Sequence, residues 1–325
     1  MPNSAPQHHL TVVANPRSGR GRAGGLLGRI ERAFKEGLPD SAVEIVLSKS
    51  FEDAFEQAHR VAHAAEPPHY GERRDTLVMV GGDGMAHVGI NGAAGSSAEL
   101  GIVPAGTGDD FSKGVGIKRD PMKAVGQIIE GKTRSIDALK VTGGPNGDFL
   151  RYCGSIISSG WDARINAKVN ARRINLGKLS YFASMFTEMV SWRAVPYRLI
   201  IDGEPYELDA ILVAIGNAGF FGGGIPICPF ADPDDGVLDL TIVHKASRVE
   251  FFKTLGSLYT GKFIKNKYIE IRRAHTVELD GDGLIPMADG EALTAAPLTC
   301  SAVANALTLI ADPKLVKTRP WPTTK

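Results

Sequence analysis

Two acidic glycine turns lie close together in this chain: Gly81-Gly82-Asp83-Gly84 and Ala105-Gly106-Thr107-Gly108-Asp109-Asp110. Each follows a short apolar run, residues 76–80 and 100–103, of the kind that forms a buried strand. Residues 85–94, between the turns, have the length of a helix. The segment therefore predicts a strand, a glycine turn, a helix, a second strand and a second glycine turn, which is typical of a nucleotide-phosphate site.

The glycines and aspartates of these turns indicate phosphoryl transfer. Backbone N–H groups approach phosphate oxygens closely only where no Cβ intervenes. Asp83, Asp109 and Asp110 would repel phosphate unless a cation lies between them, so Mg²⁺ or a protonated donor is implied. Ordinary surface turns are the alternative. Both turns follow apolar strands, however, and open α/β sheets bind their ligands at the carboxyl ends of strands.

Strands alternate with helices through the first part of the chain. Apolar runs predict strands at residues 10–14 and 43–47, and amphipathic periodicity predicts helices at residues 22–34 and 51–65. This alternation is typical of a parallel sheet covered by helices on both faces. Residues 1–137 are therefore expected to form a three-layer, Rossmann-like nucleotide-binding domain of the α/β class. The C-terminal segment, residues 304–325, is a candidate addition to that domain.

The pattern changes after about residue 137. Runs of strands joined by Gly, Asp and Pro turns predict an antiparallel sheet or sandwich over residues 138–303, expected to be a second, β-rich substrate domain. A chain of 325 residues is long for a single core, so two domains are expected. A helix predicted at residues 176–192 has an apolar face, for which packing in the core and contact with an acyl chain both stay open.

The composition limits the partners and the compartment. A formal net charge of +1 gives no electrostatic footprint for nucleic acid. Cys153, Cys228 and Cys300 are far apart and lack metal-binding spacing, which indicates buried thiols in a reducing compartment. The polar amino terminus does not resemble a signal peptide, and no apolar run reaches the length of a membrane span. We expect a cytoplasmic protein that meets its substrate at the inner surface of the membrane.

Five motifs carry a resemblance to a known family. In chain order they are Asn15-Pro16-Arg17-Ser18-Gly19-Arg20-Gly21, Gly81-Gly82-Asp83-Gly84, Gly101-Ile102-Val103-Pro104-Ala105-Gly106-Thr107-Gly108-Asp109-Asp110-Phe111, Gly216-Asn217-Ala218-Gly219-Phe220-Phe221-Gly222-Gly223-Gly224 and Asp289-Gly290-Glu291. With these motifs the chain resembles the diacylglycerol kinase catalytic-domain family. That family includes bacterial soluble lipid kinases and sphingosine kinases, with NAD kinases as more distant relatives.

The resemblance implies that ATP binds to three loops with Mg²⁺. Glycines let the backbone approach the phosphates, arginines neutralise them, and Ser48 lies near the adenosine. The implied nucleotide contacts are Asn15, Arg17, Ser18, Ser48, Gly81, Gly82, Asp83, Gly84, Met85, His87, Gly106, Thr107 and Asp110. Asp83 is expected to act through Mg²⁺.

The chain contains two Asp-Gly-Glu triplets, and one of them is the candidate base. Asp202-Gly203-Glu204 joins two predicted strands and is expected to form a type I′ hairpin turn. Asp289-Gly290-Glu291 matches the late acidic motif of the family, which reaches the γ-phosphate in the cleft between the domains. Phosphorylation of a hydroxyl needs a carboxylate that accepts or aligns its proton. Asp289 and Glu291 are therefore predicted to be catalytic, together with Asp83.

The segment Asp232-Pro233-Asp234-Asp235-Gly236-Val237 is a candidate for a second metal site. In bacterial members of the family, a similar segment holds a structural Mg²⁺. The resemblance implies the Asp235 side chain and the carbonyl groups of Asp232 and Val237 as its ligands. A polar turn before the next strand is the alternative, and the sequence does not decide between them.

Three positions depart from the family pattern. Met85 stands where members usually have Thr, His87 where they commonly have Asn or Glu, and Asp109 where they have Asn. Met85 has either replaced a dispensable hydroxyl or packs beneath the loop. Because the three positions depart together, a repacked loop is the favoured explanation.

The predicted function is that of an ATP-dependent lipid kinase. The favoured acceptor is diacylglycerol, which would give phosphatidic acid. The alternatives are an enzyme similar to NAD kinase and a nucleotide-binding sensor without catalytic activity. The expected partners are a lipid substrate at the membrane surface and, as a further candidate, a second copy of the chain.

Overall fold

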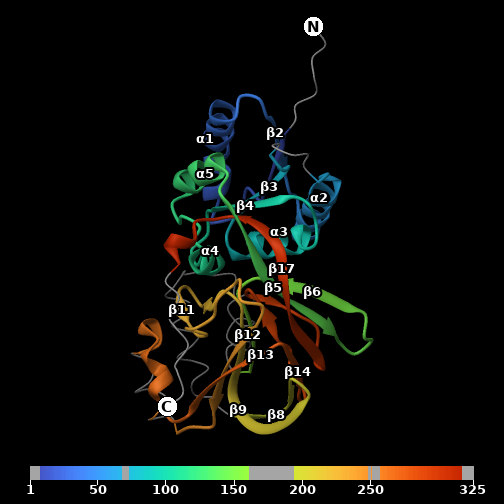
Figure 1. The fold of residues 1–325 in the computed structure, drawn as a ribbon, viewed down its shortest axis with the longest axis vertical. Coiled ribbons are helices and arrows are strands. Elements are labelled where there is room, and N and C mark those ends of the chain that lie inside the picture. Colours follow the sequence, from blue (N-terminus) through green and yellow to red (C-terminus); the bar gives the residue numbers. More distant parts are fainter. Residues whose placement is uncertain (1–7, 68–72, 161–193, 248–249, 251–256, 317–325) are drawn as a thin grey trace. The chain divides into compact units, whose positions relative to one another are not determined.

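The computed structural model describes residues 8–67, 73–160, 194–247, 250 and 257–316. In this part the chain forms two compact units (Figure 1). The first comprises the described residues up to Ile136 together with residues 305–316, and the second comprises those from Asp137 to Ala304. The helix predicted at residues 176–192 lies outside the described residues.

The sheet of the first unit is parallel. Its strands are β1 (His9–Ala14), β2 (Ala42–Leu47), β3 (Thr76–Gly81), β4 (Glu99–Pro104) and the last residues of β17 (Leu298–Ile310). They lie in the order β2-β1-β3-β4-β17, with Leu10 opposite Thr76 and Thr308 opposite Glu99. The central strands β3 and β4 are buried at every residue, which is why they read as continuous apolar runs.

Helices cover both faces of this sheet. They are α1 (Arg22–Gly37), α2 (Phe51–Ala64), α3 (Asp83–Ala93), α4 (Asp110–Val115) and α5 (Pro121–Glu130). Leu10 and Val12 of β1 pack in one core with Phe34 of α1 and Ile128 of α5. α3 packs against β3 and β4 and contacts α2. The three-layer α/β prediction is therefore confirmed.

Side chains define where these helices begin. Ser50 caps α2 by accepting a hydrogen bond from the Asp53 N–H at 3.1 Å. Asp120 caps α5 by accepting from the Lys123 N–H at 3.0 Å, and Pro121 occupies the first helical position. Both caps satisfy N–H groups that have no partner inside the helix.

The second unit is rich in antiparallel strands. Its strands are β5 (Thr133–Gly143, which starts in the first unit), β6 (Phe149–Cys153), β7 (Ile156–Gly160), β8 (Val195–Ile201), β9 (Glu204–Gly216), β10 (Phe220–Phe221), β11 (Ile225–Pro226), β12 (Leu238–His244), β13 (Ile269–Ala274), β14 (Thr276–Asp280), β15 (Met287–Ala288), β16 (Glu291–Ala292) and the first part of β17. Short 3₁₀ helices lie at Leu258–Thr260 (η2) and Lys262–Lys265 (η3), and a third, η4 (Pro313–Leu315), belongs to the first unit.

The long strand β9 organises this sheet. Its first half pairs with β8 and its second half pairs with β7 and β12, all antiparallel. The residues of the second half, from Ala210 to Gly216, are buried without exception, as expected of a strand covered on both faces. The predicted β-sandwich-like second domain is therefore confirmed. Among the described residues, no helix combines the length and apolarity needed to cross a membrane.

Candidate nucleotide and phosphoryl-transfer site

Three glycine loops meet at the carboxyl ends of β1, β3 and β4. A Cβ on Gly19 would collide with the carbonyl oxygen of Ala105, and a Cβ on Gly106 would lie 2.5 Å from Cα of Gly82. These contacts require glycine, because any side chain would separate the loops. Ser18 belongs to the same cluster, since its Oγ lies 3.1 Å from the position of a Cβ on Gly81. The structure thus brings the three predicted phosphate loops together.

The first loop is a tight turn closed by its own hydrogen bonds. The Asn15 Oδ1 accepts from the Arg17 N–H at 3.0 Å, and the Asn15 carbonyl accepts from the Ser18 N–H at 3.0 Å. Gly19, Arg20 and Gly21 then all have positive φ, at 60°, 62° and 87°. The Gly21 N–H donates to the Arg17 carbonyl at 3.2 Å, so the loop is held by hydrogen bonds of its own backbone. At the end of β2, the Ser48 hydroxyl donates to the Ala14 carbonyl at 3.3 Å, which holds it beside this loop.

Asp83 holds the acidic loop that follows β4. Its Oδ2 accepts from the Asp109 N–H at 2.9 Å, and its Oδ1 accepts from the N–H groups of Asp110 at 2.7 Å and Phe111 at 3.4 Å. Burial, and after it the charges of Asp110 and Asp109, raise the pKa of Asp83 to about 7. The N–H donors oppose that shift because they favour the carboxylate. Both oxygens of Asp83 thus bind backbone N–H groups and order the loop that carries Asp109 and Asp110, and its expected action through Mg²⁺ stays a prediction.

The other predicted residues of the acidic loop lie at the tip and the base. Thr107 is exposed, Gly106 and Gly108 are half-buried, and Asp110 is 9% exposed where α4 begins. Asp109 has a φ of 54°, a left-handed conformation that Asn and Asp tolerate better than other residues. The substitution of Asn by Asp at this position is therefore compatible with the backbone.

His87 does not lie among the phosphate loops. Its ring is 2% exposed and packs edge-on against Phe55 of α2, with 6.0 Å between ring centroids. The Asn91 Nδ2 lies 3.3 Å from the His87 Nε2. The predicted nucleotide contact of His87 is therefore withdrawn, because the residue belongs to the packing between α2 and α3.

Met85 packs beneath the second loop. It is 4% exposed, and its Cβ and Cγ fill the space that a side chain on Gly81 would need. This position agrees with the packing explanation for Met85. The three departures do not form one cluster, however, because His87 faces α2 and Asp109 lies near Gly106.

Replacing Met85 with threonine is expected to lower stability and activity together. The change removes buried apolar atoms and places a hydroxyl in their position, at a cost of about 2 kcal/mol. Thermal unfolding of Met85→Thr, followed by circular dichroism, measures the loss. An unchanged melting temperature with higher ATP turnover would instead support a dispensable hydroxyl.

The two Asp-Gly-Glu triplets form the same kind of turn. Asp202 and Gly203 have φ of 48° and 88° between β8 and β9, which confirms the predicted hairpin. Asp289 and Gly290 have φ of 51° and 92° between β15 and β16. Positive φ at both central residues is the signature of a type I′ turn. Local backbone form therefore does not distinguish the two triplets.

Their aspartates differ in what they bind. Asp202 accepts from two N–H groups at the start of β14, those of His275 at 2.9 Å and Thr276 at 2.8 Å. Asp289 accepts from the N–H groups of Gly154 at 3.0 Å and Ser155 at 2.8 Å. Each carboxylate ties its hairpin to another part of the second unit. Asp289 is thus occupied by these N–H donors and by the Cys153 thiol, and the catalytic roles of Asp289 and Glu291 stay predictions.

The turn between β6 and β7 was missed from the sequence. This turn, Gly154-Ser155, donates to Asp289 and also accepts a hydrogen bond from Asn217. The Asn217 Nδ2 donates to the Gly154 carbonyl at 3.1 Å and to the Asp137 carbonyl at 2.9 Å. The Ser155 hydroxyl donates to the Phe220 carbonyl at 2.6 Å. The glycine-rich motif that begins at Gly216 thereby supports the hairpin of Asp289. A Gly-Ser pair between two strands gives no signal of these distant partners.

The donor set at Asp235 does not fit the predicted structural Mg²⁺. The Asp235 Oδ2 lies 3.0 Å from the Arg273 Nη2, and its Oδ1 accepts from the Val237 N–H at 3.2 Å. Arg273 also lies 3.4 Å from the Asp239 Oδ1. Within the described ranges, no group of three or more His, Cys, Asp or Glu side chains could hold a metal ion. In place of the predicted ligation by Asp232, Asp235 and Val237, a guanidinium neutralises this turn.

Without divalent cations, the nucleotide-free protein is expected to be as stable as it is with excess Mg²⁺. A Mg²⁺ site occupied at a hundred times its Kd would contribute about 2.7 kcal/mol, and Arg273 makes such a contribution unnecessary here. Thermal unfolding with EDTA and with excess Mg²⁺ provides the measurement. A clear fall of the melting temperature in EDTA would contradict the assignment of Arg273.

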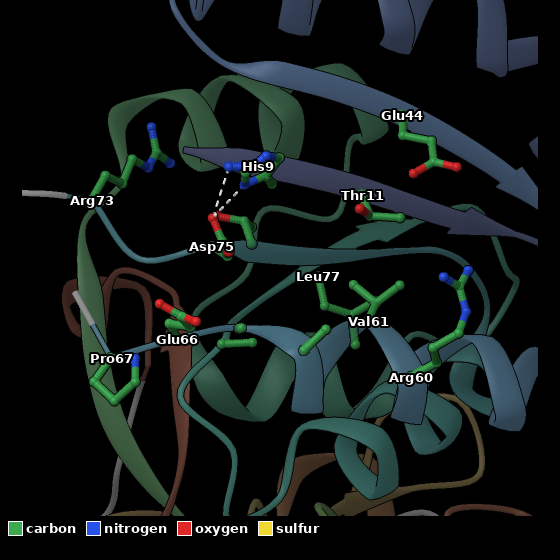
Figure 2. A pocket seen from close by; sticks show the side chains of 14 residues that line it. His9, Thr11, Glu44, Arg60, Val61, Glu66, Pro67, Arg73, Asp75 and Leu77 are labelled. Atoms are coloured by element: carbon green, nitrogen blue, oxygen red, sulfur yellow. Dashed lines mark hydrogen bonds and ion pairs between the residues drawn. The ribbon is translucent and has the colours of Figure 1, made fainter. Parts of the chain in front are cut away.

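A cavity of about 500 Å³ lies at the opposite edge of the first sheet (Figure 2). Its wall includes His9 and Thr76, which begin β1 and β3, and Arg60 of α2. The Asp75 carboxylate accepts from the His9 N–H at 2.8 Å. Because the glycine loops follow the carboxyl ends of these strands, this cavity is separate from the candidate nucleotide site.

Comparisons with known proteins agree with this arrangement. Residues 9–141 match the model of the diacylglycerol kinase catalytic domain, and residues 155–311 match that of the YegS C-terminal NAD kinase beta sandwich-like domain. A protein named diacylglycerol kinase from Mycobacterium tuberculosis is 32% identical over 93% of this chain and 94% of its own length. One from Staphylococcus aureus is 25% identical over 82% and 81%.

Solved structures share the fold. A putative diacylglycerol kinase from Bacillus anthracis str. Sterne has a TM-score of 0.76 and 24% identity, with 95% of this chain and 98% of that chain covered. At 24% identity, this similarity shows the fold alone. The identity to the mycobacterial protein and the two matching models together settle the predicted family. This chain belongs to the diacylglycerol kinase catalytic-domain family and is a kinase.

Proposed function

We propose that the protein is an ATP-dependent lipid kinase that transfers the γ-phosphate of ATP to a lipid hydroxyl, with diacylglycerol as the acceptor and phosphatidic acid as the product. The observation that carries the proposal is the convergence of three glycine loops at the carboxyl ends of β1, β3 and β4, with two buried aspartates on the third loop. Names of relatives support the acceptor, since the similar proteins from two bacteria are named diacylglycerol kinase.

The first unit supplies the nucleotide site of this proposal. The loop from Asn15 to Gly21, which carries Arg17 and Arg20, and the N–H groups of the turn that starts α3 bind the phosphates. Asp83 holds the third loop in place through its three N–H contacts. Asp110 is the residue that would hold Mg²⁺ together with the phosphates, since Mg²⁺ usually takes one or two carboxylates and phosphate oxygens. The ion would neutralise charge on the phosphates.

The second unit supplies the base. Glu291 accepts the proton of the lipid hydroxyl, the hydroxyl oxygen forms a bond to the γ-phosphorus, and the bond from that phosphorus to the β-γ bridging oxygen breaks to release ADP. Asp289 positions Glu291 by binding the turn of Gly154 and Ser155. A base held by a locked hairpin needs little reorganisation in the transition state.

Transfer of radiolabelled γ-phosphate from ATP tests the proposal. The purified protein is incubated with mixed vesicles that contain diacylglycerol, with sphingosine and with NAD in separate reactions. Label in phosphatidic acid is the expected result. Label in NADP would support the alternative enzyme, and nucleotide binding without transfer to any acceptor would support the sensor.

The proposal includes action at a membrane surface. Diacylglycerol resides in bilayers, so a cytoplasmic enzyme has to meet it at the inner face of the membrane. Vesicle sedimentation with and without diacylglycerol measures this association. Transfer to diacylglycerol dispersed in detergent, combined with no association with vesicles at any lipid composition, would contradict the membrane part of the proposal.

A further inference from the structure

Three carboxylates gather where the proposed function requires a polyanion to bind. Asp109 is 7% exposed and Asp110 is 9% exposed. Their N–H groups donate to the third carboxylate, that of Asp83, at 2.9 and 2.7 Å. Burial raises the pKa of Asp83 and of Asp109, because negative charge is poorly solvated there. Phosphate binding at this loop therefore requires compensating positive charge.

Arg119 supplies positive charge at the tip of this loop. Its Nη2 donates to the Gly108 carbonyl oxygen at 3.2 Å, and Gly108 directly precedes Asp109. Burial raises the pKa of Asp109. Three groups lower this pKa and so oppose the effect of burial. The charge of Arg119 has the largest effect, followed by the Gly106 N–H and the charge of Arg22. Its bond to the residue that precedes Asp109 thus places Arg119 as a counter-charge for Asp109.

The backbone on both sides of Arg119 is fixed. The Lys118 N–H donates to the Gln127 Oε1 at 3.1 Å, and Gln127 is 3% exposed. Asp120, on the other side, caps α5. An arginine held in this way loses less conformational entropy when its guanidinium binds a partner than one on a free loop.

The guanidinium retains donors for a ligand. An arginine has five N–H donors in a planar fork that suits phosphate. In the part of the chain that the structure describes, the acceptor of this guanidinium is the Gly108 carbonyl, and the residue is exposed. Arg119 can therefore face Asp109 and a phosphate at the same time.

We propose that Arg119 is a positioning residue for the nucleotide, which neutralises Asp109 and so allows the phosphates of MgATP to approach a loop with one aspartate more than the family pattern. This inference rests on the proposed function, because it assumes a nucleotide at the three loops. It explains why an aspartate is tolerated at position 109, where the family pattern has asparagine: the counter-charge comes from Arg119, outside the motif. Asp109 and Arg119 form one electrostatic unit.

A double-mutant cycle on MgADP binding tests this coupling. Isothermal titration at low salt is expected to show about fivefold weaker binding for Arg119→Gln, as for a single partly exposed charge. Asp109→Asn alone is expected to change the Kd by less than about twofold, and Asp109→Asn in the Arg119→Gln background is expected to restore binding. Arg119→Lys keeps the charge and is expected to retain most of the affinity. Lys123→Gln on α5 is the control for a lost positive charge outside the loop.

The outcomes separate this inference from the proposed function. If the wild-type protein binds no MgADP, both the proposed function and this inference are wrong. If it binds MgADP and Arg119→Gln binds equally well, the inference alone is wrong. A loss in Arg119→Gln that Asp109→Asn does not relieve would also overturn it, since Arg119 would then act independently of Asp109. Higher salt is expected to reduce the effect of Arg119→Gln, because exposed charges are screened.

Discussion

Replacing Glu291 with glutamine is expected to lower the rate of phosphoryl transfer by about 10²- to 10⁴-fold, the usual contribution of a general base. Glutamine has the same shape but cannot accept the proton. The substitution leaves the backbone contacts of the hairpin intact, because Asp289 and its partners Gly154 and Ser155 hold it. The kcat with ATP and diacylglycerol measures the effect, and the melting temperature verifies the fold.

Glu204→Gln is the matched control for this prediction. Glu204 follows an Asp-Gly turn of the same backbone form and is exposed. Its substitution is expected to change the kcat by less than twofold, within the range of surface changes away from a site. Wild-type rates in both variants would show that neither triplet supplies the base, and equal losses in both would indicate an effect on folding.

The second large effect is expected at Asp83. Asp83→Asn keeps the size of the side chain but offers one oxygen and one NH₂ group where two oxygens accept hydrogen bonds from Asp109, Asp110 and Phe111. At least one buried N–H then faces a donor, which costs about 1–3 kcal/mol. The acidic loop is expected to lose its order, so that both MgATP and metal-free ADP bind more weakly.

The comparison of MgATP with metal-free ADP distinguishes a loop-ordering role of Asp83 from a role through a bridging metal. A residue that acts only through a bridging metal would weaken MgATP and leave metal-free ADP unchanged, and that result would contradict the loop-ordering role. Asp120→Asn is the matched control in the same unit, because Asp120 accepts a helix-capping bond through one oxygen and asparagine caps helices equally well. It is expected to preserve nucleotide affinity and melting temperature.

Residues that are close in sequence were predicted well. The strand predicted at residues 43–47 is β2, Ala42–Leu47, and the helix predicted at residues 22–34 is the first part of α1, Arg22–Gly37. The Asp202-Gly203 turn has the expected positive φ at both residues. Backbone torsion angles and periodic burial depend on residues only a few positions apart, so the sequence by itself carries this information.

The partners of charged side chains were decided by tertiary structure. Asp83 binds N–H groups more than 25 residues away, Asp289 binds a turn more than 130 residues away, and Asp235 meets Arg273 from another strand. No periodicity relates such positions, because a carboxylate binds whichever donor the packed elements bring within about 3 Å.

By itself, the sequence determined that this protein has a parallel α/β unit with three glycine loops, followed by a β-rich unit, since the order of short apolar runs and turns specifies those elements. Only the tertiary structure decided what the acidic residues do there. It gave Asp83 and Asp289 backbone donors as partners, placed His87 in the contact with α2, and distinguished two triplets of identical sequence by the partners of their aspartates. The physical reason is that hydrogen bonding and burial of a polar side chain depend on its neighbours in space.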